Sequence, residues 1–567
     1  MEKFGIPIPR NCDEALKFDV ESGTTYWSDA IDREQRNVNI AFDFRDKAPP
    51  GYQKIRCHWV FDIKMDGTRK ARFVAGGHLT ETPSSITYSS VVSRDSIRIL
   101  LVVAALNDLD LSSCDIQNAY LTAFPREKVY FVAGSEFGDN FGRTVVVVRA
   151  LYGLKSSGAA FRSKLAETLR EMGYCASQAD PDVWMRPRNK PNGTCYYEYV
   201  CVYVDDVLCI SADTSVFMKK FSTLFTLKAG YSTPSTFLGA EILQYELSDP
   251  KGRRYTSWGL GSSKYLSNII VELEKRLVNL NLSLPTTANA PIRSGYHPEN
   301  DITPLLNEVD VGWYQGLIGT LRWLVEIGRI DIMHSCTIMS TYLQSPREGH
   351  LFELFHIFGY LKKHMNYSLV LDPESLPFNR NLSSDQSDWS DFYHNVKEAI
   401  PPNAPPPRGQ PVETTFYVDA DHANDTSNRR SHSGILGYVQ GAPVLWYSKK
   451  QATVESSTHG AELVATRIAV EFIESIRYKL RMFGVPILGP TILLCDNMSV
   501  VHNGTRPEST LKKKHNSISF HKLRESVAAG YVELHKVHTS ENLADLLTKI
   551  LSGVTTANLV ANILVKV

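Results

Sequence analysis

YYEYVCVYVDDVLCIS, residues 196–211, is the most informative stretch of this sequence. Two runs of β-branched and aromatic residues flank Asp205 and Asp206, which predicts two strands joined by a tight turn. An adjacent Asp pair is more often an ordinary acidic turn than a catalytic site, because Asp is common in turns. If both carboxylates are buried, they repel each other unless a cation lies between them.

A carboxylate further upstream changes the interpretation of this turn. In SSCDIQNAYLTAF, residues 112–124, Asp115 closes a strand-like run and Tyr120 follows five residues later. Phosphoryl transfer by two divalent ions needs oxygen ligands that come together from different segments. Asp115, Asp205 and Asp206 supply such a set, in which one ion activates a primer 3′-hydroxyl and the other stabilises the departing pyrophosphate.

Four more carboxylates are spread over the C-terminal part of the chain. Asp419 ends the strand-like run FYVDA, Glu462 lies near the start of a long helical segment, Asp496 ends the apolar run TILLC, and Asp545 begins a closing helix. A two-metal hydrolase needs carboxylates at several strand or helix ends, because one ion generates hydroxide and the other takes the leaving oxygen. Each carboxylate alone has an ordinary explanation; Glu462, for example, suits the dipole of a helix N-terminus.

Composition sets broad limits. A chain of 567 residues predicts two to four domains. The net charge is +0, so any phosphate-binding surface must be local, within the basic runs 69–72, 449–450 or 512–514. Solvated surface explains each run equally well. The nine cysteines include no CxxC pair, which argues against a disulfide framework or a zinc knuckle, and neither a signal peptide nor a membrane span is predicted.

A polar and proline-rich segment divides the chain, and such a composition does not build a core. Downstream of it, the pattern predicts three strands, a long helix, a strand, further helix, a strand and a final helix. The predicted divisions are a lead-in (1–50), an alternating α/β part (51–250), a mostly helical part (251–375), the linker (376–411), a compact α/β domain (412–552) and a tail (553–567).

Several sequence blocks identify a family. Upstream of the linker they are FDIKMDGTRKARFVAGGH (61–78), TYSSVVSRDSIRILL (87–101), DIQNAYL (115–121), LYGLKSSGAAF (151–161), YVDD (203–206), FLGAEI (237–242) and YQGLIGTLRWL (314–324). Through them, residues 9–371 resemble the reverse transcriptase of copia-type LTR retrotransposons. Downstream the blocks are DADHANDTSNRRSHSG, WYSKKQATVESS, GAEL, CDN and LADLLTK. There, residues 414–551 resemble the ribonuclease H that follows this reverse transcriptase.

The resemblance implies a multidomain α/β and α+β fold. A right-hand polymerase with fingers, palm and thumb (51–250 and 251–375) would precede a connection region and a ribonuclease H-like α/β domain. It also implies that each site holds two Mg²⁺ ions, or Mn²⁺. The implied ligands are Asp115, Asp205 and Asp206 at the first site, and Asp419, Glu462, Asp496 and Asp545 at the second.

Substrate-contacting residues follow from the same resemblance. Tyr120 stands where the family has an aromatic residue that screens the sugar at its 2′ position, and Tyr203 and Val204 belong to the turn. Lys64, Arg72 and Lys155 are candidates for holding the triphosphate, although plain surface exposure is an equal alternative. The implied partners are an RNA template, a DNA primer, an RNA–DNA hybrid and deoxynucleotides, with no membrane. A homodimer or an association with integrase stays open, as does a location in cytoplasmic particles or the nucleus.

The chain departs from the family pattern at two places. Gly158 and Phe161 stand where Pro and Trp are common, and residues 329–332 read RIDI in place of RPDI. Neither departure removes a metal ligand. His538 lies near the position of a product-release histidine in many ribonucleases H, but an ordinary strand residue is the better interpretation.

Other modules of a copia-type polyprotein have no motif in this sequence. It contains no nucleocapsid zinc knuckle, no DTG or DSG protease signature and no HHCC integrase motif, so we expect the back end of a polyprotein, processed, truncated or in its own reading frame. One alternative function is an inactive or domesticated nucleic-acid-binding protein. Another is a polymerase of the non-LTR or intron type, which the linker and the copia-type blocks disfavour.

Overall fold

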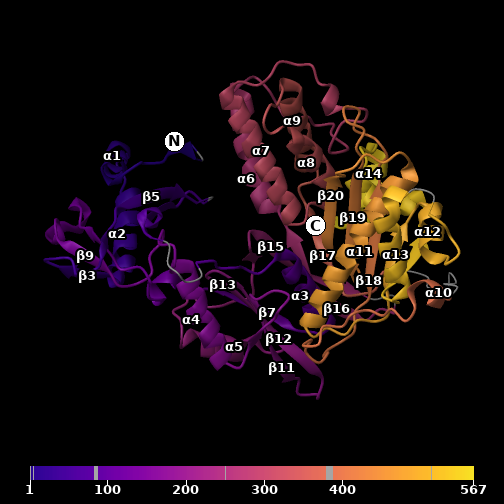
Figure 1. Cartoon of the computed structure of the whole chain (residues 1–567). Helices are drawn as coiled ribbons and strands as arrows, with labels where there is room; N and C mark the ends of the chain where they lie inside the picture. Colours follow the sequence, from indigo (N-terminus) through magenta and orange to yellow (C-terminus); the bar gives the residue numbers. More distant parts are fainter. Residues whose placement is uncertain are drawn as a thin grey trace.

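The computed structural model describes residues 2–3, 5–64, 66–81, 87–248, 251–377, 387–511 and 514–566. Residues 378–386 of the predicted linker, and Lys512 and Lys513 of the last basic run, lie outside these parts. Within them, three five-stranded sheets and one four-stranded sheet are covered by helices (Figure 1). No helix in the described parts combines the length with the apolar character that crossing a bilayer requires.

The N-terminal region combines two helices, a hairpin and a sheet with the strand order β3-β9-β8-β4. Alternation along β6 buries Ala71 and Phe73 and turns Lys70 and Arg72 to the opposite face. That face lines a cavity, as shown below. The elements are β1 (Glu2–Lys3), β2 (Ile6–Pro7), α1 (Cys12–Ser22), α2 (Tyr26–Val38), β3 (Phe42–Arg45), β4 (Gln53–Lys54), β5 (Cys57–Ile63), β6 (Arg69–Ala75), β8 (Val129–Val132) and β9 (Thr144–Val147).

The central sheet has the antiparallel order β10-β11-β12-β13-β7. Its strands are β7 (Asp110–Asp115), β10 (Cys175–Ala176), β11 (Val183–Asn189), β12 (Cys195–Tyr203) and β13 (Asp206–Ser211), and its helices are α3 (Arg94–Leu106), α4 (Ser157–Glu171) and α5 (Thr214–Ser222). Residues of α4 and α5 share one core with this sheet, and α3 belongs to a second, larger core. Almost every residue of α3 is buried, as expected for a helix enclosed on all sides.

The middle sheet has the order β14-β15-β16-β17-β23 and is followed by a group of helices. Its last strand, β23, comes from the segment predicted as a tail. This strand pairs with β17, so the end of the chain is part of the sheet. Residues 329–332 are one of the places where the chain departs from the family pattern. There Arg329 and Asp331 form a buried ion pair, with Nη2 of the arginine 2.7 Å from Oδ2 of the aspartate. The elements are β14 (Thr236–Phe237), β15 (Ala240–Ser248), β16 (Arg254–Gly261), β17 (Tyr367–Leu371), β23 (Leu564–Lys566), α6 (Ser263–Asn279), α7 (Glu308–Glu326), α8 (Met333–Met339) and α9 (Glu348–Lys363).

The C-terminal sheet has the order β20-β19-β18-β21-β22, with β18, β21 and β22 parallel. The order of strands and helices predicted downstream of the linker is confirmed up to the last helix, which is instead a short 3-10 helix, η10 (Leu543–Leu547). The other elements are β18 (Thr414–Ala420), β19 (His432–Val439), β20 (Ala442–Lys450), α11 (Thr458–Met482), β21 (Thr491–Cys495), α12 (Met498–Thr505), α13 (Ser517–Ala528), β22 (Val532–Lys536) and α14 (Gly553–Val560).

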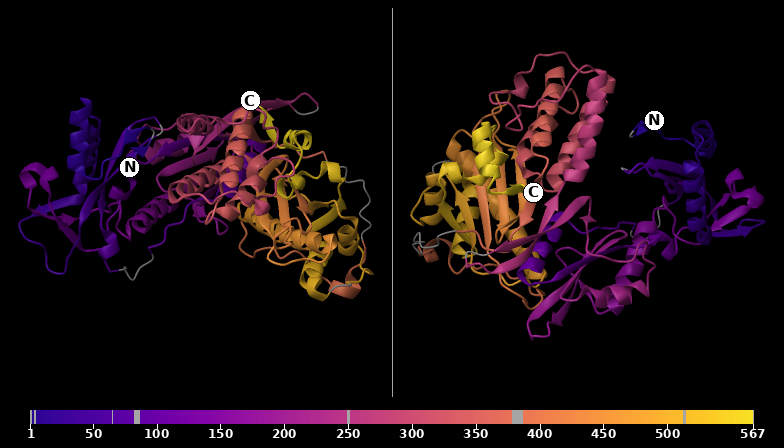
Figure 2. Two further views of the ribbon diagram at one scale, coloured as in Figure 1. Left: turned by 90° about the horizontal axis from the view of Figure 1, so that it is seen from above. Right: turned by 180° about the vertical axis from the view of Figure 1, so that it is seen from behind.

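The C-terminal domain packs directly on the central sheet. The Tyr199 hydroxyl donates to the Phe483 carbonyl at 2.7 Å, and Lys479 Nζ lies 2.5 Å from an Asp95 carboxylate oxygen. The described part of the predicted linker contains α10 (Ser390–Tyr393), and its Glu398 pairs with Arg477 of α11. One hydrophobic core runs through the central sheet, the middle sheet and the C-terminal sheet. The N-terminal region and the C-terminal domain lie at opposite ends of the molecule (Figure 2).

Candidate active sites

The first site lies at the turn between β12 and β13. Tyr203 and Asp206 are the last paired residues of this hairpin, and Val204 and Asp205 form its turn. Val204 has a φ of 57°, in the left-handed region that residues with a β-branched side chain rarely adopt. Strand β7 pairs with β13 so that Asp115 stands directly opposite Asp206. Three carboxylates from two segments therefore meet at one end of the central sheet.

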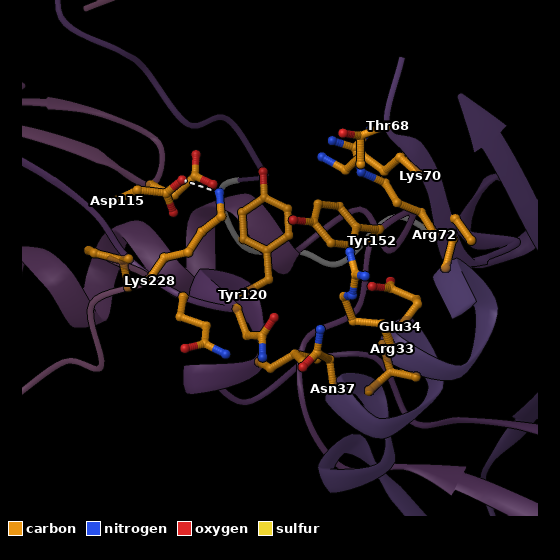
Figure 3. Close-up of a pocket in the computed structure, with 18 of the residues that line it drawn as sticks. Arg33, Glu34, Asn37, Thr68, Lys70, Arg72, Asp115, Tyr120, Tyr152 and Lys228 are labelled. Carbon is orange, nitrogen blue, oxygen red and sulfur yellow. Dashed lines mark hydrogen bonds and ion pairs between the residues drawn. The ribbon is translucent and has the colours of Figure 1, made fainter. Parts of the chain in front are cut away.

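The electrostatics of this sheet end favour a bound cation. Burial, together with the like charges of Asp205 and Asp115, raises the pKa of Asp206 to about 6. The pKa of Asp205 is also raised, mainly by burial. The Lys228 ammonium donates to Asp115 at 2.8 Å, and this hydrogen bond raises the pKa of the lysine (Figure 3). Neighbouring carboxylates that are partly buried need a nearby positive charge if all of them are to be ionised at once.

A cavity of about 310 Å³ opens beside Asp115 and Asp205. Its other walls come from α2 and from the hairpin β5–β6, and they gather positive charge (Figure 3). The cationic side chains are Arg33, Lys64, Arg69, Lys70, Arg72 and Lys228. Partial burial and the neighbouring cations lower the pKa of Lys70. The cavity therefore suits a polyanionic ligand whose charged groups reach from the cations to the carboxylates.

The three predicted phosphate-binding cations are placed differently. Lys64 and Arg72 line the cavity, and the Arg72 guanidinium lies 5.4 Å from the centroid of the Tyr152 ring. Lys155 does not belong to the lining, and its Nζ donates to the Thr80 carbonyl oxygen at 2.5 Å. The structure thus brings two of the three to the first site.

Tyr120 forms an aromatic wall of the same cavity. It lies in the 3-10 helix η3 (Ala119–Thr122), and its ring centroid is 5.0 Å from Tyr152 and 6.1 Å from Phe161. Burial and the neighbouring Asp205 raise the pKa of its hydroxyl. Phe161, at one departure from the family pattern, is buried and packs edge-on against this ring. Rings packed in this way hold the wall rigid beside the carboxylates.

The second site lies at one edge of the C-terminal sheet. Strands β18 and β21 are parallel with Val418 opposite Cys495, so Asp419 and Asp496 leave the sheet at the same edge. Glu462 reaches this edge from α11 and Asp545 reaches it from η10. The structure therefore brings together the four carboxylates that the sequence placed at separate strand and helix ends.

The four carboxylates form two overlapping groups. One oxygen each of Asp419, Asp496 and Asp545 lie within 4.8 Å of one another, and Glu462 and Asp496 form a similar group with Cys495. Burial raises the pKa of Asp419 and of Glu462, and it raises the pKa of Asp545 to about 6. The buried Oε2 of Glu462 has no hydrogen-bond partner in the described part of the chain. An unpartnered buried carboxylate oxygen in such a cluster suits a cation ligand.

A lysine that sequence reasoning missed bridges two of these carboxylates. Lys549 Nζ lies 2.7 Å from Asp545 and 3.2 Å from Asp419, and the Thr548 hydroxyl also donates to Asp419. Both carboxylates raise the pKa of Lys549 against the effect of its burial. The spacing of four residues between Asp545 and Lys549 is a signal that could have identified this pair.

A cavity of about 620 Å³ opens at the second site. Asp419, Glu462 and Asp496 line it, but one wall comes from residues 295–297, which belong to the segment between α6 and α7. His538 is exposed, bonds Ser540 at 2.7 Å, and is not among the lining residues.

Comparisons with known proteins show what this chain is similar to. Residues 42–271 match a family model described as reverse transcriptase (RNA-dependent DNA polymerase). The retrovirus-related Pol polyprotein from transposon RE1 of Arabidopsis thaliana is 27% identical over 98% of this chain and 34% of its own length. That from transposon TNT 1-94 of Nicotiana tabacum is 26% identical over 88% of this chain and 35% of its own length. The chain therefore spans about a third of the length of these curated relatives.

Solved structures also show local likeness to this chain. The N-terminal RNase H domain of a Mycobacterium tuberculosis protein has 10% identity and a TM-score of 0.20, covering 26% of this chain and 97% of that one. LC11-RNase H1 in complex with an RNA/DNA hybrid has 15% identity and a TM-score of 0.20, covering 24% of this chain and 94% of that one.

Proposed function

We propose that this chain, which is related over nearly its whole length to copia-type retrotransposon Pol polyproteins and contains a reverse transcriptase domain, is an RNA- and DNA-templated DNA polymerase with ribonuclease H activity. The observation that supports this proposal most is the meeting of seven carboxylates at two sheet ends, three beside the β12–β13 turn and four beside β18 and β21. Synthesis of DNA and removal of the RNA strand would then take place in two parts of one chain.

In this proposal the regions of the chain have polymerase names. Residues 51–250 are fingers and palm, 251–375 are thumb and connection, and 412–552 are the ribonuclease H-like domain, joined to the rest by residues 376–411. The central antiparallel sheet, with the N-terminal region on one side and α6 to α9 on the other, supports this division (Figure 1).

At the first site, Asp115, Asp205 and Asp206 hold the metal ions. Lys64 and Arg72 bind triphosphate oxygens, since an ammonium and a guanidinium facing the carboxylates across the cavity match the charge of a nucleotide. Lys70 and Lys228, which line the same cavity, are added to this set. The Tyr120 ring blocks the space of a 2′-hydroxyl, while Tyr203 and Val204 shape the turn that presents the carboxylates.

Both sites fit divalent ions by the chemistry of their ligands. Clustered carboxylate oxygens with raised pKa values, and the unpartnered buried oxygen of Glu462, are what Mg²⁺ or Mn²⁺ prefers. When bound, such ions activate the attacking oxygen and stabilise the leaving oxygen of an in-line phosphoryl transfer. We propose two ions at each site.

At the second site, Asp419, Glu462, Asp496 and Asp545 are the ligands. The Thr548 hydroxyl donates to one oxygen of Asp419, so that this carboxylate keeps one orientation. The wide cavity leaves room for the backbone of an RNA–DNA hybrid above the carboxylates. The proposed substrates of the whole chain are a primed RNA template, deoxynucleotides and the hybrid that polymerisation produces.

The test is primer extension by the purified full chain. With Mg²⁺ or Mn²⁺ it should extend a DNA primer on an RNA template and cleave the RNA of the hybrid, and chelation should stop both. The double variant Asp205→Asn, Asp206→Asn should lose extension and keep cleavage. A protein that shifts the hybrid on a gel without any turnover would instead be a nucleic-acid-binding protein, and the proposal would be wrong.

A further inference from the structure

The segment between α6 and α7 reaches across to the C-terminal domain. Its residues Gly295, Tyr296 and His297 form a wall of the second cavity, opposite elements that carry Asp419 and Glu462. This segment lies more than a hundred residues before the domain whose cavity it lines. The second site is therefore not made by the C-terminal domain alone.

The segment is fixed to α9 at two points. Arg293 donates to the buried Glu353 carboxylate through its backbone N–H at 2.9 Å and through Nε at 2.6 Å. The Pro298 carbonyl oxygen lies 2.9 Å from Nε2 of His350. Both partners belong to the same helix, so the polymerase half of the chain determines the position of the segment.

The segment is also fixed to the C-terminal domain. The Glu299 carboxylate accepts hydrogen bonds from Thr426, at 2.8 Å from the hydroxyl and 3.3 Å from the backbone N–H. Thr426 lies in the loop that follows β18, four residues after His422, which lines the cavity together with Asp421. Charge-assisted hydrogen bonds of this kind order the two loops against each other.

Among the residues of this wall, His297 is the best placed to bind a ligand. Its side chain is 44% exposed, and Nδ1 lies 3.2 Å from the Glu299 carboxylate, which in turn is held by Thr426. With Nδ1 donating to the Glu299 carboxylate, Nε2 is the ring nitrogen that remains for a ligand, and it donates to that ligand when the ring is the imidazolium, which carries a proton on both nitrogens. The ring is exposed, lines the cavity and is held in one orientation by the half-buried Glu299 carboxylate, so it can meet a ligand that enters the cavity.

Tyr296 stands beside it with a fixed hydroxyl. This hydroxyl donates to Asp301 at 3.2 Å, and the Arg293 guanidinium lies 5.3 Å from the ring centroid. The wall therefore offers an imidazole and an aromatic ring, next to a cluster of carboxylates that would repel a phosphate by itself. Donors beside such a cluster are needed to position an anionic backbone.

We propose that residues 293–301 complete the substrate site of the ribonuclease, with His297 donating to a backbone phosphate of the RNA–DNA hybrid and Tyr296 packing against an adjoining sugar. This inference rests on the proposed ribonuclease function. It makes the nuclease site a composite of two parts of the chain, and His297, not His538, is the histidine that meets the hybrid there. The helices α6 and α7, which the segment connects, stand between the N-terminal region and the C-terminal sheet (Figure 1).

The test compares His297→Ala with His538→Ala in the full chain. His538 is a matched control, because it is also exposed and hydrogen-bonded through Nδ1 but does not line the cavity. His297→Ala should raise the KM for hybrid cleavage about ten-fold with kcat changed less than two-fold, as expected for loss of one phosphate contact. His297→Gln, which keeps a donor, should restore most of the lost affinity, and primer extension should not change in any variant.

A hydroxyl-radical footprint of the hybrid, taken in Ca²⁺ without turnover, tests the contact directly. His297→Ala should remove protection from the few nucleotides next to the second site and leave the rest of the footprint intact. An unchanged KM, or an unchanged footprint, would overturn the proposal. A parallel loss of kcat, extension and melting temperature would also overturn it, by showing that His297 only supports the fold. If the wild type protects these nucleotides but never cleaves, the ribonuclease function fails while the contact stands.

Discussion

Replacing Lys549 by Met tests whether an ammonium occupies a metal position at the second site. Nζ lies 2.7 Å from Asp545 and 3.2 Å from Asp419, whose side chains are 9% and 1% exposed. Methionine keeps the apolar stem and removes the charge. An ion that binds between these carboxylates must first displace the ammonium, so the variant should bind the ion more tightly.

The magnitude follows from the two contacts. A hydrogen bond to a charged group contributes about 1.5–3 kcal/mol. Because the Lys549 side chain is 32% exposed, solvent screening reduces the pair to about 2 kcal/mol in total. Removing this competition should tighten ion binding by about 2 kcal/mol, which is roughly thirty-fold in Kd. In the metal-free protein the same loss should lower the melting temperature, and saturating ion should restore it.

The assay is a calorimetric Mn²⁺ titration of the full chain, with Asp205→Asn and Asp206→Asn present so that the second site is measured. Lys522→Met is the matched control, because Lys522 pairs with Glu474 at 2.6 Å and is also 32% exposed, but it lies away from the carboxylates. The control should leave the Mn²⁺ affinity unchanged. An affinity that falls or stays constant in Lys549→Met would refute the idea that ammonium and ion share one position.

Three further perturbations have defined outcomes. The raised pKa values of Asp206 and Asp545, both about 6, mean that the folded metal-free protein binds more protons than the unfolded chain between about pH 4 and 6. Its stability should therefore fall as pH rises through this window, while Mg²⁺ affinity rises and binding releases protons, which calorimetry in buffers of different ionisation enthalpy would detect. Tyr120→Val should reduce the preference for deoxynucleotides over ribonucleotides about ten- to a hundred-fold in kcat/KM, since removing a steric block of this size changes discrimination by about 1–3 kcal/mol; an unchanged ratio would remove Tyr120 from the sugar site. Val204→Gly should stabilise the protein by about 1 kcal/mol because the left-handed conformation costs Val more than Gly, whereas Val202→Gly in β12 should lower the melting temperature.

The sequence allowed the carboxylates to be predicted because each lies where a regular element ends. Asp115 ends β7 and Asp206 begins the neighbouring strand β13, and Asp419 and Asp496 lie at the same ends of two parallel strands, so local pattern and sheet order lead to the same places. The alternation of β6 likewise explains why Arg72 reaches the first cavity. The period-two alternation and the ends of strands can both be recognised from the sequence without knowledge of the tertiary structure.

Contacts made between distant segments could not be predicted in this way. Lys228 donates to Asp115, which lies 113 residues earlier in the sequence. His297 lines a cavity whose other lining residues lie at Asp419 and beyond, apart from its neighbours Gly295 and Tyr296. Neither Lys228 nor His297 lies in a local sequence pattern that would identify its contact partner. The proline-rich composition of residues 376–411 predicted a linker without a core of its own, and Glu398 of that segment pairs with Arg477 of α11. Composition reports which segments lack a core of their own, and does not report whether they pack on another.

The central claim is that one chain contains two separate phosphoryl-transfer sites. It is tested most directly by one reaction on a doubly labelled hybrid, in which DNA extension and RNA cleavage are followed together for Asp115→Asn and for Asp496→Asn. The account predicts that Asp115→Asn abolishes extension and leaves cleavage within two-fold of wild type, and that Asp496→Asn does the reverse. Loss of both activities in either variant, or normal extension by Asp115→Asn, would contradict it.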